Sequence, residues 1–124
     1  MGPSPQLEIL MLGNDPVLAY LIGRYARQSG FGITARQGIP QAAEVRDQKP
    51  AALLFTSVES LEAAQGLIIG LANCEIPVLV CASVADEARA RELGADHCLL
   101  HPLTYEGFLE VLAAQSATDS PGRQ

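Results

Sequence analysis

The chain has 124 residues, of which 48% are hydrophobic and 18% are charged, with a formal net charge of −6. This length and apolar content fit one domain with a substantial core and leave no room for a second domain. The acidic balance and the scattered arginines disfavour direct binding to nucleic acid. No apolar run approaches the ~20 residues that a membrane helix needs, and the first residues, MGPSPQ, carry no export signal, so we expect a cytoplasmic protein without membrane contact.

The first part of the chain predicts a strand followed by a helix. Residues 7–12, LEILML, form an unbroken apolar run, which is typical of a strand buried on both faces of a parallel sheet. Asp15 and Pro16 then predict the start of a helix, with Asp15 as its N-cap and Pro16 in its first turn. This helix extends to about Ser29, and its predicted inner face consists of Leu18, Leu21, Ile22 and Tyr25.

The rest of the chain repeats this alternation. Further strands are predicted at 32–36, 51–55, 77–81 and 98–100, and further helices at 40–48, 59–72, 85–93 and 104–115. A strand followed each time by a helix predicts a parallel sheet covered by helices on both faces, which is a doubly wound, flavodoxin-like α/β fold with strand order 2-1-3-4-5. We expect residues 7–115 to form this domain, 1–6 to be a flexible N-terminus, and 116–124 to be a flexible tail or the start of a linker.

The three cysteines are expected to be free thiols. Cys81 and Cys98 lie within predicted buried strands, where cysteine behaves as a small hydrophobic residue, and the total number of cysteines is odd. Disulfide bonds are therefore not expected.

The last third of the chain carries a family resemblance. The segments IPVLVC, ELGADHCLL and HPLTYEGFLEVL follow one another closely between residues 76 and 112. Their order, with the Gly-Ala-Asp and His-Pro punctuation, resembles the end of a bacterial response-regulator receiver (CheY-like) domain, and the resemblance extends over residues 7–115. The spacing between Ala82 and His101 is tighter than is usual in that family, which predicts a shortened helix between the fourth and fifth strands.

The resemblance also assigns a place to each residue of the receiver phosphorylation site. Receivers use an acidic pair for magnesium, an aspartate that accepts the phosphoryl group, and a hydroxyl, an aromatic residue and a lysine that respond to it. In this chain Gly13 and Asn14 take the places of the acidic pair, with Asp15 just beyond, and Thr56 takes the place of the phosphoacceptor aspartate. Ala82 takes the place of the hydroxyl residue, with Ser83 one residue later. Cys98 takes the place of the aromatic residue, and His101 takes the place of the lysine.

Every position that would carry phosphoryl chemistry therefore differs from the family pattern. Threonine cannot form the acyl phosphate that a carboxylate forms, and one displaced Asp15 beside Asn14 is a poor magnesium site. The resemblance thus implies a degenerate receiver, or pseudo-receiver, within two-component or phosphorelay signalling. We expect no enzymatic activity, no bound metal and no cofactor.

The residues around this site also offer other chemistry. Asp96, His97, Cys98 and His101 contain metal-binding residue types, but neighbouring strand residues point to opposite faces, which disfavours a metal site. His101 alone, on the rim of the crevice, is either a solvated histidine or a pH-sensing or anion-binding group. The hydroxyls of Thr56, Ser57 and Ser83 either line an anion pocket or, as we favour, cap the helices that follow. No glycine-rich phosphate loop is present, so a nucleotide is not expected.

Several apolar helix residues have no obvious place in the core. In the helix at 59–72 the predicted inner face is Leu61, Ala64, Ile68 and Leu71, which leaves Leu67 and Ile69 over. In the final helix Phe108, Val111 and Leu112 are predicted to point inward. The apolar residues left over on the first and last helices are Val17, Tyr20, Tyr105 and Leu109. If clustered, such residues mark a partner site.

Two functional hypotheses follow. The first is a non-phosphorylatable signalling domain that acts through protein contacts, as a homodimer or with a partner or attached output domain. Its surface would be formed by the helix at 85–93, the strand at 98–100 and the last helix, or by the first and last helices. The second hypothesis is a flavodoxin-like domain that binds a small ligand or anion in the crevice near Asn14, Thr56, Ser83 and His101. The sequence favours the first, because the crevice offers no convincing acid–base or nucleophile–base pair.

Overall fold

Five parallel strands form one sheet in the order β2-β1-β3-β4-β5, as the sequence predicts. The computed structural model describes residues 7–119, so the predictions for 1–6 and 120–124 lie outside the described residues. Within that range the elements are β1 (Leu7–Leu12), α1 (Pro16–Gln28), β2 (Phe31–Arg36), α2 (Ala42–Gln48), β3 (Ala52–Phe55), α3 (Val58–Ala63), α4 (Gln65–Gly70), β4 (Val78–Ala82), the 3₁₀ turn η1 (Val84–Asp86), α5 (Glu87–Glu92), β5 (His97–Leu100) and α6 (Tyr105–Asp119).

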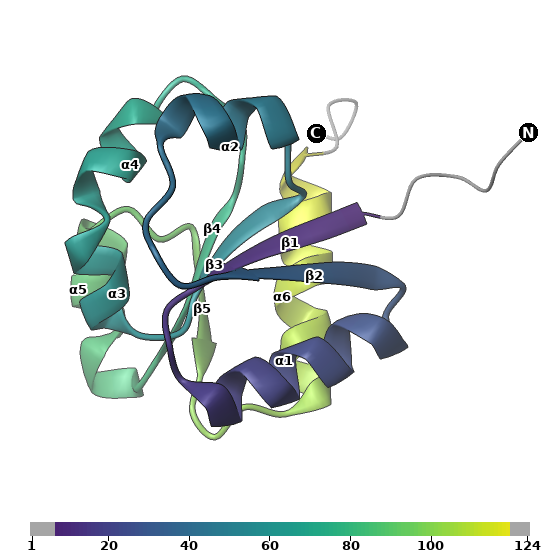
Figure 1. Cartoon of the computed structure of the whole chain (residues 1–124). Helices are drawn as coiled ribbons and strands as arrows, with labels where there is room; N and C mark the ends of the chain where they lie inside the picture. The colour runs from purple at the N-terminus through teal and green to yellow at the C-terminus, as the bar shows by residue number, and fades with distance from the viewer. Residues whose placement is uncertain (1–6, 120–124) are drawn as a thin grey trace, which may run out of the picture.

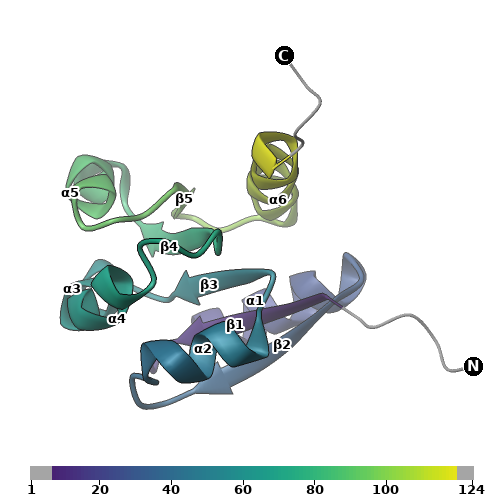
Figure 2. The same ribbon diagram turned by 90° about the horizontal axis from the view of Figure 1, so that it is seen from above.

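Helices cover both faces of the sheet (Figures 1 and 2). Helices α1 and α6 pack on one face, through residues such as Ile22 and Phe108, which are fully buried. Helices α2, α3, α4 and α5 cover the other face, where Val45, Leu61 and Ala90 are fully buried. The central strands β3 and β4 are buried along their whole lengths, as expected for strands with helices on both sides.

The helix predicted at 59–72 is instead two short helices. Helix α3 ends at Ala63, and Ala64, with φ −104° and ψ 23°, separates it from α4. The interruption rotates the second helix, so that Leu67 is only 5% exposed, while Ile69 is 72% exposed. The prediction that Leu67 would be left outside the core was therefore wrong, and the prediction for Ile69 is confirmed.

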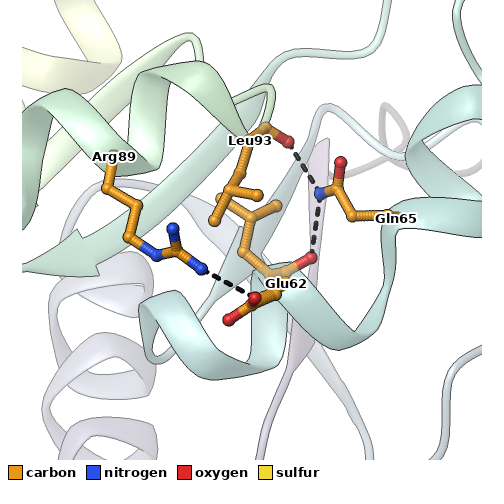
Figure 3. Close-up of polar contacts among 5 residues, drawn as sticks. Glu62, Gln65, Arg89 and Leu93 are labelled. Atoms are coloured by element: carbon orange, nitrogen blue, oxygen red, sulfur yellow. Dashed lines mark hydrogen bonds and ion pairs between the residues drawn. The ribbon is translucent and has the colours of Figure 1, made fainter.

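A polar bridge holds this interruption against α5 (Figure 3). The side-chain amide of Gln65 donates to the carbonyl of Leu61, at 3.1 Å, and to the carbonyl of Leu93, which ends α5, at 2.8 Å. Beside it, Arg89 of α5 pairs with Glu62 of α3 at 2.7 Å. One amide thus satisfies carbonyls from two helix ends.

Two further boundaries differ from the predictions. The helix predicted at 85–93 begins as the 3₁₀ turn η1 and becomes α-helical only at Glu87, so the α-helix between β4 and β5 has six residues. The last helix continues to Asp119, past the domain end predicted at 115. No helix among residues 7–119 combines the length and hydropathy needed to cross a bilayer.

Candidate functional site

The carboxyl ends of β1, β3, β4 and β5 bring the predicted site positions to one edge of the sheet. Backbone pairing continues one residue beyond the strands: the Thr56 N–H donates to the Leu12 carbonyl at 3.0 Å, and the His101 N–H donates to the Ala82 carbonyl at 3.1 Å. In an open α/β sheet this edge is where ligands bind. The fold therefore gathers Gly13, Asn14, Asp15, Thr56, Ala82 and His101 at this edge.

Gly13 and Thr56 are in direct contact at this edge of the sheet, where β1 and β3 end. Gly13 has a φ of +121°, and a Cβ atom built on it would overlap the hydroxyl oxygen of Thr56 and lie 3.1 Å from the Thr56 Cβ. Thr56 is only 4% exposed. The space beside the end of β3 is therefore occupied by the threonine side chain, and glycine is the residue that leaves room for it.

The carboxylate of Asp15, two residues after Gly13 in the sequence, is engaged in helix capping. Its Oδ1 accepts hydrogen bonds from the backbone N–H groups of Val17 and Leu18, both at 3.1 Å. Pro16 occupies the first turn, so the predicted N-cap and proline of α1 are both confirmed. Asn14, the neighbour of Asp15, is exposed.

The three hydroxyls do not behave alike. Ser57 caps α3 in a capping box with Ser60, as the capping interpretation predicts. Ser83 makes no side-chain cap; its hydroxyl instead donates to the carboxylate of Asp86 at 3.2 Å. Thr56 is buried against Gly13 and precedes the capping serine. The capping prediction was therefore right for Ser57 and wrong for Thr56 and Ser83.

The positions on β4 and β5 carry little polar chemistry. Ala82 is 3% exposed and brings no hydroxyl. Cys98 is buried in the core on the α5 side, whereas Cys81 is buried on the α1 and α6 side, so the two thiols lie on opposite faces of the sheet. Burial raises the pKa of Cys81 to about 12, with a further contribution from the charge of Asp15, and burial also raises the pKa of Cys98. Both thiols are therefore protonated near neutral pH, and all three cysteines are free.

His101 is exposed at the end of β5, followed by Pro102 in a cis peptide bond. Along β5, His97 is half-buried and Cys98 is buried. Among residues 7–119, no group of three or more histidine, cysteine or acidic side chains is arranged to hold a metal ion.

The four predicted partner-binding residues differ in exposure. Val17 and Tyr20 on α1 are 68% and 64% exposed, and Leu109 on α6 is 38% exposed. Tyr105 is half-buried, because its ring packs on Tyr25 with centroids 5.5 Å apart. Tyr105 therefore helps to join α6 to α1 rather than standing wholly free.

One pocket lies elsewhere, and the sequence did not predict it. A half-open pocket of about 270 Å³ between α2 and the start of the sheet is lined by Glu8, Leu10, Thr34, Gln48 and Pro50. The hydroxyl of Thr34 donates to the Glu8 carboxylate at 2.9 Å, so its central polar groups satisfy one another. The feature of the sequence that could have indicated this pocket is Glu8, a charged residue within the apolar run at 7–12.

No family model matches the sequence, and no curated protein matches it. Solved structures do match. A response regulator from Thermotoga maritima has a TM-score of 0.73 at 15% identity, over 91% of this chain and 99% of that one. The receiver domain of a sensor histidine kinase from Pseudomonas aeruginosa has a TM-score of 0.69 at 19% identity, over 91% of this chain and 99% of that one.

Full-length FixJ from B. japonicum also matches, with a TM-score of 0.67 and 18% identity. The match covers 92% of this chain but only 59% of FixJ. At these identities the similarities establish the fold, which is that of response-regulator receiver domains.

Proposed function

We propose that this domain is a receiver-like signalling module that is not phosphorylated and acts through contacts with other proteins. The observation that carries the proposal is the residue at the end of β3. That residue is Thr56, which is 4% exposed and lies against Gly13. A phosphorylatable receiver requires a carboxylate at this place, with access for a phosphoryl donor.

The magnesium chemistry of receivers also lacks support in this chain. The receiver domain from Pseudomonas aeruginosa holds a magnesium ion in its active-site cleft. Mg²⁺ demands octahedral oxygen ligation and is usually bound with one or two carboxylates. Here Gly13 and Asn14 bring no carboxylate, and that of Asp15 already accepts two backbone N–H groups of α1.

The residues that would respond to a phosphoryl group are replaced as well. Ala82 has no hydroxyl, Cys98 has no aromatic ring, and His101 stands where the resemblance places a lysine. The module therefore has neither the acceptor nor the sensing groups of a phosphorylation switch. We propose that it is not an enzyme, that it needs no cofactor, and that its scaffold is retained for its surfaces.

The partner is a protein, either separate or part of the same polypeptide. In FixJ the matching region is only part of a longer chain, which supports a role as one module of a larger signalling protein. The exposed apolar residues Val17, Tyr20 and Leu109, with Tyr105 at their edge, are the proposed contact residues. The alternative of an anion or ligand site in the crevice is weakened, because Thr56 is buried and Ser83 is bonded to Asp86.

Beryllium fluoride with magnesium, which mimics a phosphorylated aspartate, tests this proposal. Amide NMR spectra of the ¹⁵N-labelled chain should be unchanged by the mixture, because no carboxylate is available to bind it. The receiver domain from Pseudomonas aeruginosa serves as the positive control. Saturable shifts centred on the amides of Asp15, Thr56, Ala82 and His101 would show a working site and overturn the proposal.

A further inference from the structure

The pocket between α2 and the start of the sheet lies away from the receiver site positions. Glu8 is the second residue of β1 and Pro50 precedes β3, so the pocket is near the amino ends of these strands. Gly13 and Thr56 follow the carboxyl ends of the same two strands. The chemistry of the pocket is therefore separate from the phosphorylation chemistry of receivers.

The pocket is open because α2 covers only part of this face of the sheet. Pairing of β1 with β2 places Leu10 beside Thr34 and Glu8 beside Gly32, so these side chains lie on one face. Leu10 packs in the core with Val45 of α2 and is 1% exposed, whereas Glu8 and Thr34 are exposed. Gly32 brings no side chain to fill the space beside Glu8. A pocket with an apolar residue at its base and polar residues at its rim therefore remains.

Glu8 carries the charge of the pocket, and that charge is not neutralised. Its Oε1 accepts a hydrogen bond from the uncharged hydroxyl of Thr34 at 2.9 Å. Its Oε2 accepts no hydrogen bond, and its carboxylate makes no ion pair, within the part of the chain that the structure describes. The carboxylate therefore keeps an unused acceptor oxygen and a full negative charge.

The basic residues of this region do not supply the missing positive charge. Arg36 pairs with Glu44 at 2.6 Å, and Arg46 donates to the carbonyl of Gly70 at 3.0 Å. Lys49 makes no ion pair with any of residues 7–119. The negative charge of the pocket is thus available to a cation from outside the chain.

We propose that this pocket binds a guanidinium group. A guanidinium is a planar fork that donates two parallel hydrogen bonds to one carboxylate, here that of Glu8. It is less strongly hydrated than an ammonium group, so it can lie against the buried residues Leu10 and Pro50 at lower cost. The exposed side-chain amide of Gln48 adds a carbonyl acceptor at the rim.

The size and charge of the pocket disfavour other ligands. Its volume, about 270 Å³, is below the roughly 300–1,000 Å³ of sites for drug-sized ligands, so its occupant is a small group or a single side chain. An anion is repelled by Glu8. A metal ion is a poorer match, because Glu8 is the pocket's one carboxylate and, among residues 7–119, no group of three metal-binding side chains is arranged to hold one.

A guanidinium group can come from a free compound or from an arginine of another protein. Titration of the ¹⁵N-labelled full chain at constant ionic strength, followed by amide NMR, distinguishes these sources. One probe is agmatine, a free guanidinium compound, and the other is a blocked pentapeptide with one arginine between glycines. Binding of both supports a protein arginine as the occupant, and binding of agmatine alone supports a free compound.

Saturable shifts are expected at the amides of Glu8, Leu10, Thr34 and Gln48, with a dissociation constant on the order of 1 mM. Citrulline, which has the shape of arginine but an uncharged head group, should bind at least about 10-fold more weakly than arginine. Glu8→Gln should raise the dissociation constant for agmatine by a similar factor, because it keeps the shape of the side chain and removes its charge. The control is Glu110→Gln, which removes one exposed charge from α6 and should leave the constant unchanged.

Circular dichroism checks that both variants are folded. No saturable shift with up to about 20 mM of either probe would overturn the proposal. Equal binding by Glu8→Gln and the parent, or shifts spread over acidic residues outside the pocket, would also overturn it, because the charge of Glu8 would then not direct the binding. The beryllium fluoride test reports on the opposite edge of the sheet, so either proposal can fail while the other stands.

Discussion

Gly13 is the residue on which the packing of the site depends most. It combines a φ of +121° with a position where a Cβ would overlap the Thr56 hydroxyl. We expect Gly13→Ala to lower the free energy of unfolding by about 2 kcal/mol or more, through backbone strain and the clash together. Urea denaturation measures the change. The double variant Gly13→Ala/Thr56→Ala should recover part of the loss, because it removes the hydroxyl but not the strain.

Gly66 provides the matched control. It lies in α4, has an ordinary φ, and a Cβ there would meet nothing within 4 Å. Gly66→Ala should therefore be neutral or slightly stabilising, since alanine favours helix. A loss at Gly66 as large as that at Gly13 would mean that the structure assigns the constraint wrongly.

Cys81 gives a prediction about pH. Burial raises the pKa of its thiol from 9.0 to about 12 in the folded chain. Above pH 9 the unfolded chain ionises this thiol and binds fewer protons than the folded chain, so the free energy of unfolding falls as pH rises toward 12. The stabilisation is complete below pH 9 and is lost across that window.

Cys81→Ala removes this contribution. Between about pH 8 and about pH 10.5 the variant should lose less stability than the parent, by a difference of about 2 kcal/mol. Urea denaturation at both pH values measures it, with Cys74→Ala, at a half-buried thiol, as the control. Equal losses in the parent and Cys81→Ala would contradict the raised pKa.

At the scale of elements, the interruption at Ala64 is what the sequence could not reveal. Ala64 itself is a strong helix former, and the weak helix formers of the run, Gly66 and Gly70, lie within α4 rather than at the break. In the structure the Gln65 amide bonds Leu93, which is 28 residues away in sequence. A contact of that kind overrides local propensity, so the phase of α4 and the burial of Leu67 could not be predicted.

Gln65→Ala tests this bridge. Without the amide, the carbonyl of Leu93 loses its partner in a part-buried position, and we expect a loss of about 1 kcal/mol of unfolding free energy. Amide hydrogen exchange should also accelerate in α5. The control is Glu62→Gln, which breaks the neighbouring exposed ion pair with Arg89 and should have a smaller effect. A larger effect for Glu62→Gln would contradict the dominance of the bridge.

Sequence signals predicted the structure correctly where the interaction joins residues within one turn of the chain. Asp15 followed by Pro16 predicted the cap and first turn of α1, because both act within one turn of the chain. The bond from Ser83 to Asp86 is equally short in range, but a serine before a helix more often caps it, and here a 3₁₀ turn replaces the first α-helical turn.

At the scale of the molecule, the parallel sheet covered by helices was predictable because apolar runs alternate with amphipathic segments along the whole chain, and the resemblance to receiver domains supplied its strand order. Because the strands are parallel, their carboxyl ends lie at one edge of the sheet, and the site positions could therefore be predicted to lie there together. Two features are seen only in the folded structure: the burial of Thr56 against Gly13, and the packing of Tyr105 on Tyr25. Both depend on side chains from separate elements, whose distances the order of elements does not define.

We propose that the receiver scaffold is present here without phosphoryl chemistry. Intact-mass spectrometry after incubation with acetyl phosphate and magnesium tests it most directly. Only the unmodified mass is expected, because the end of β3 carries buried Thr56 and the Asp15 carboxylate caps α1. An acid-labile phosphoryl adduct that disappears in Asp15→Asn would contradict it.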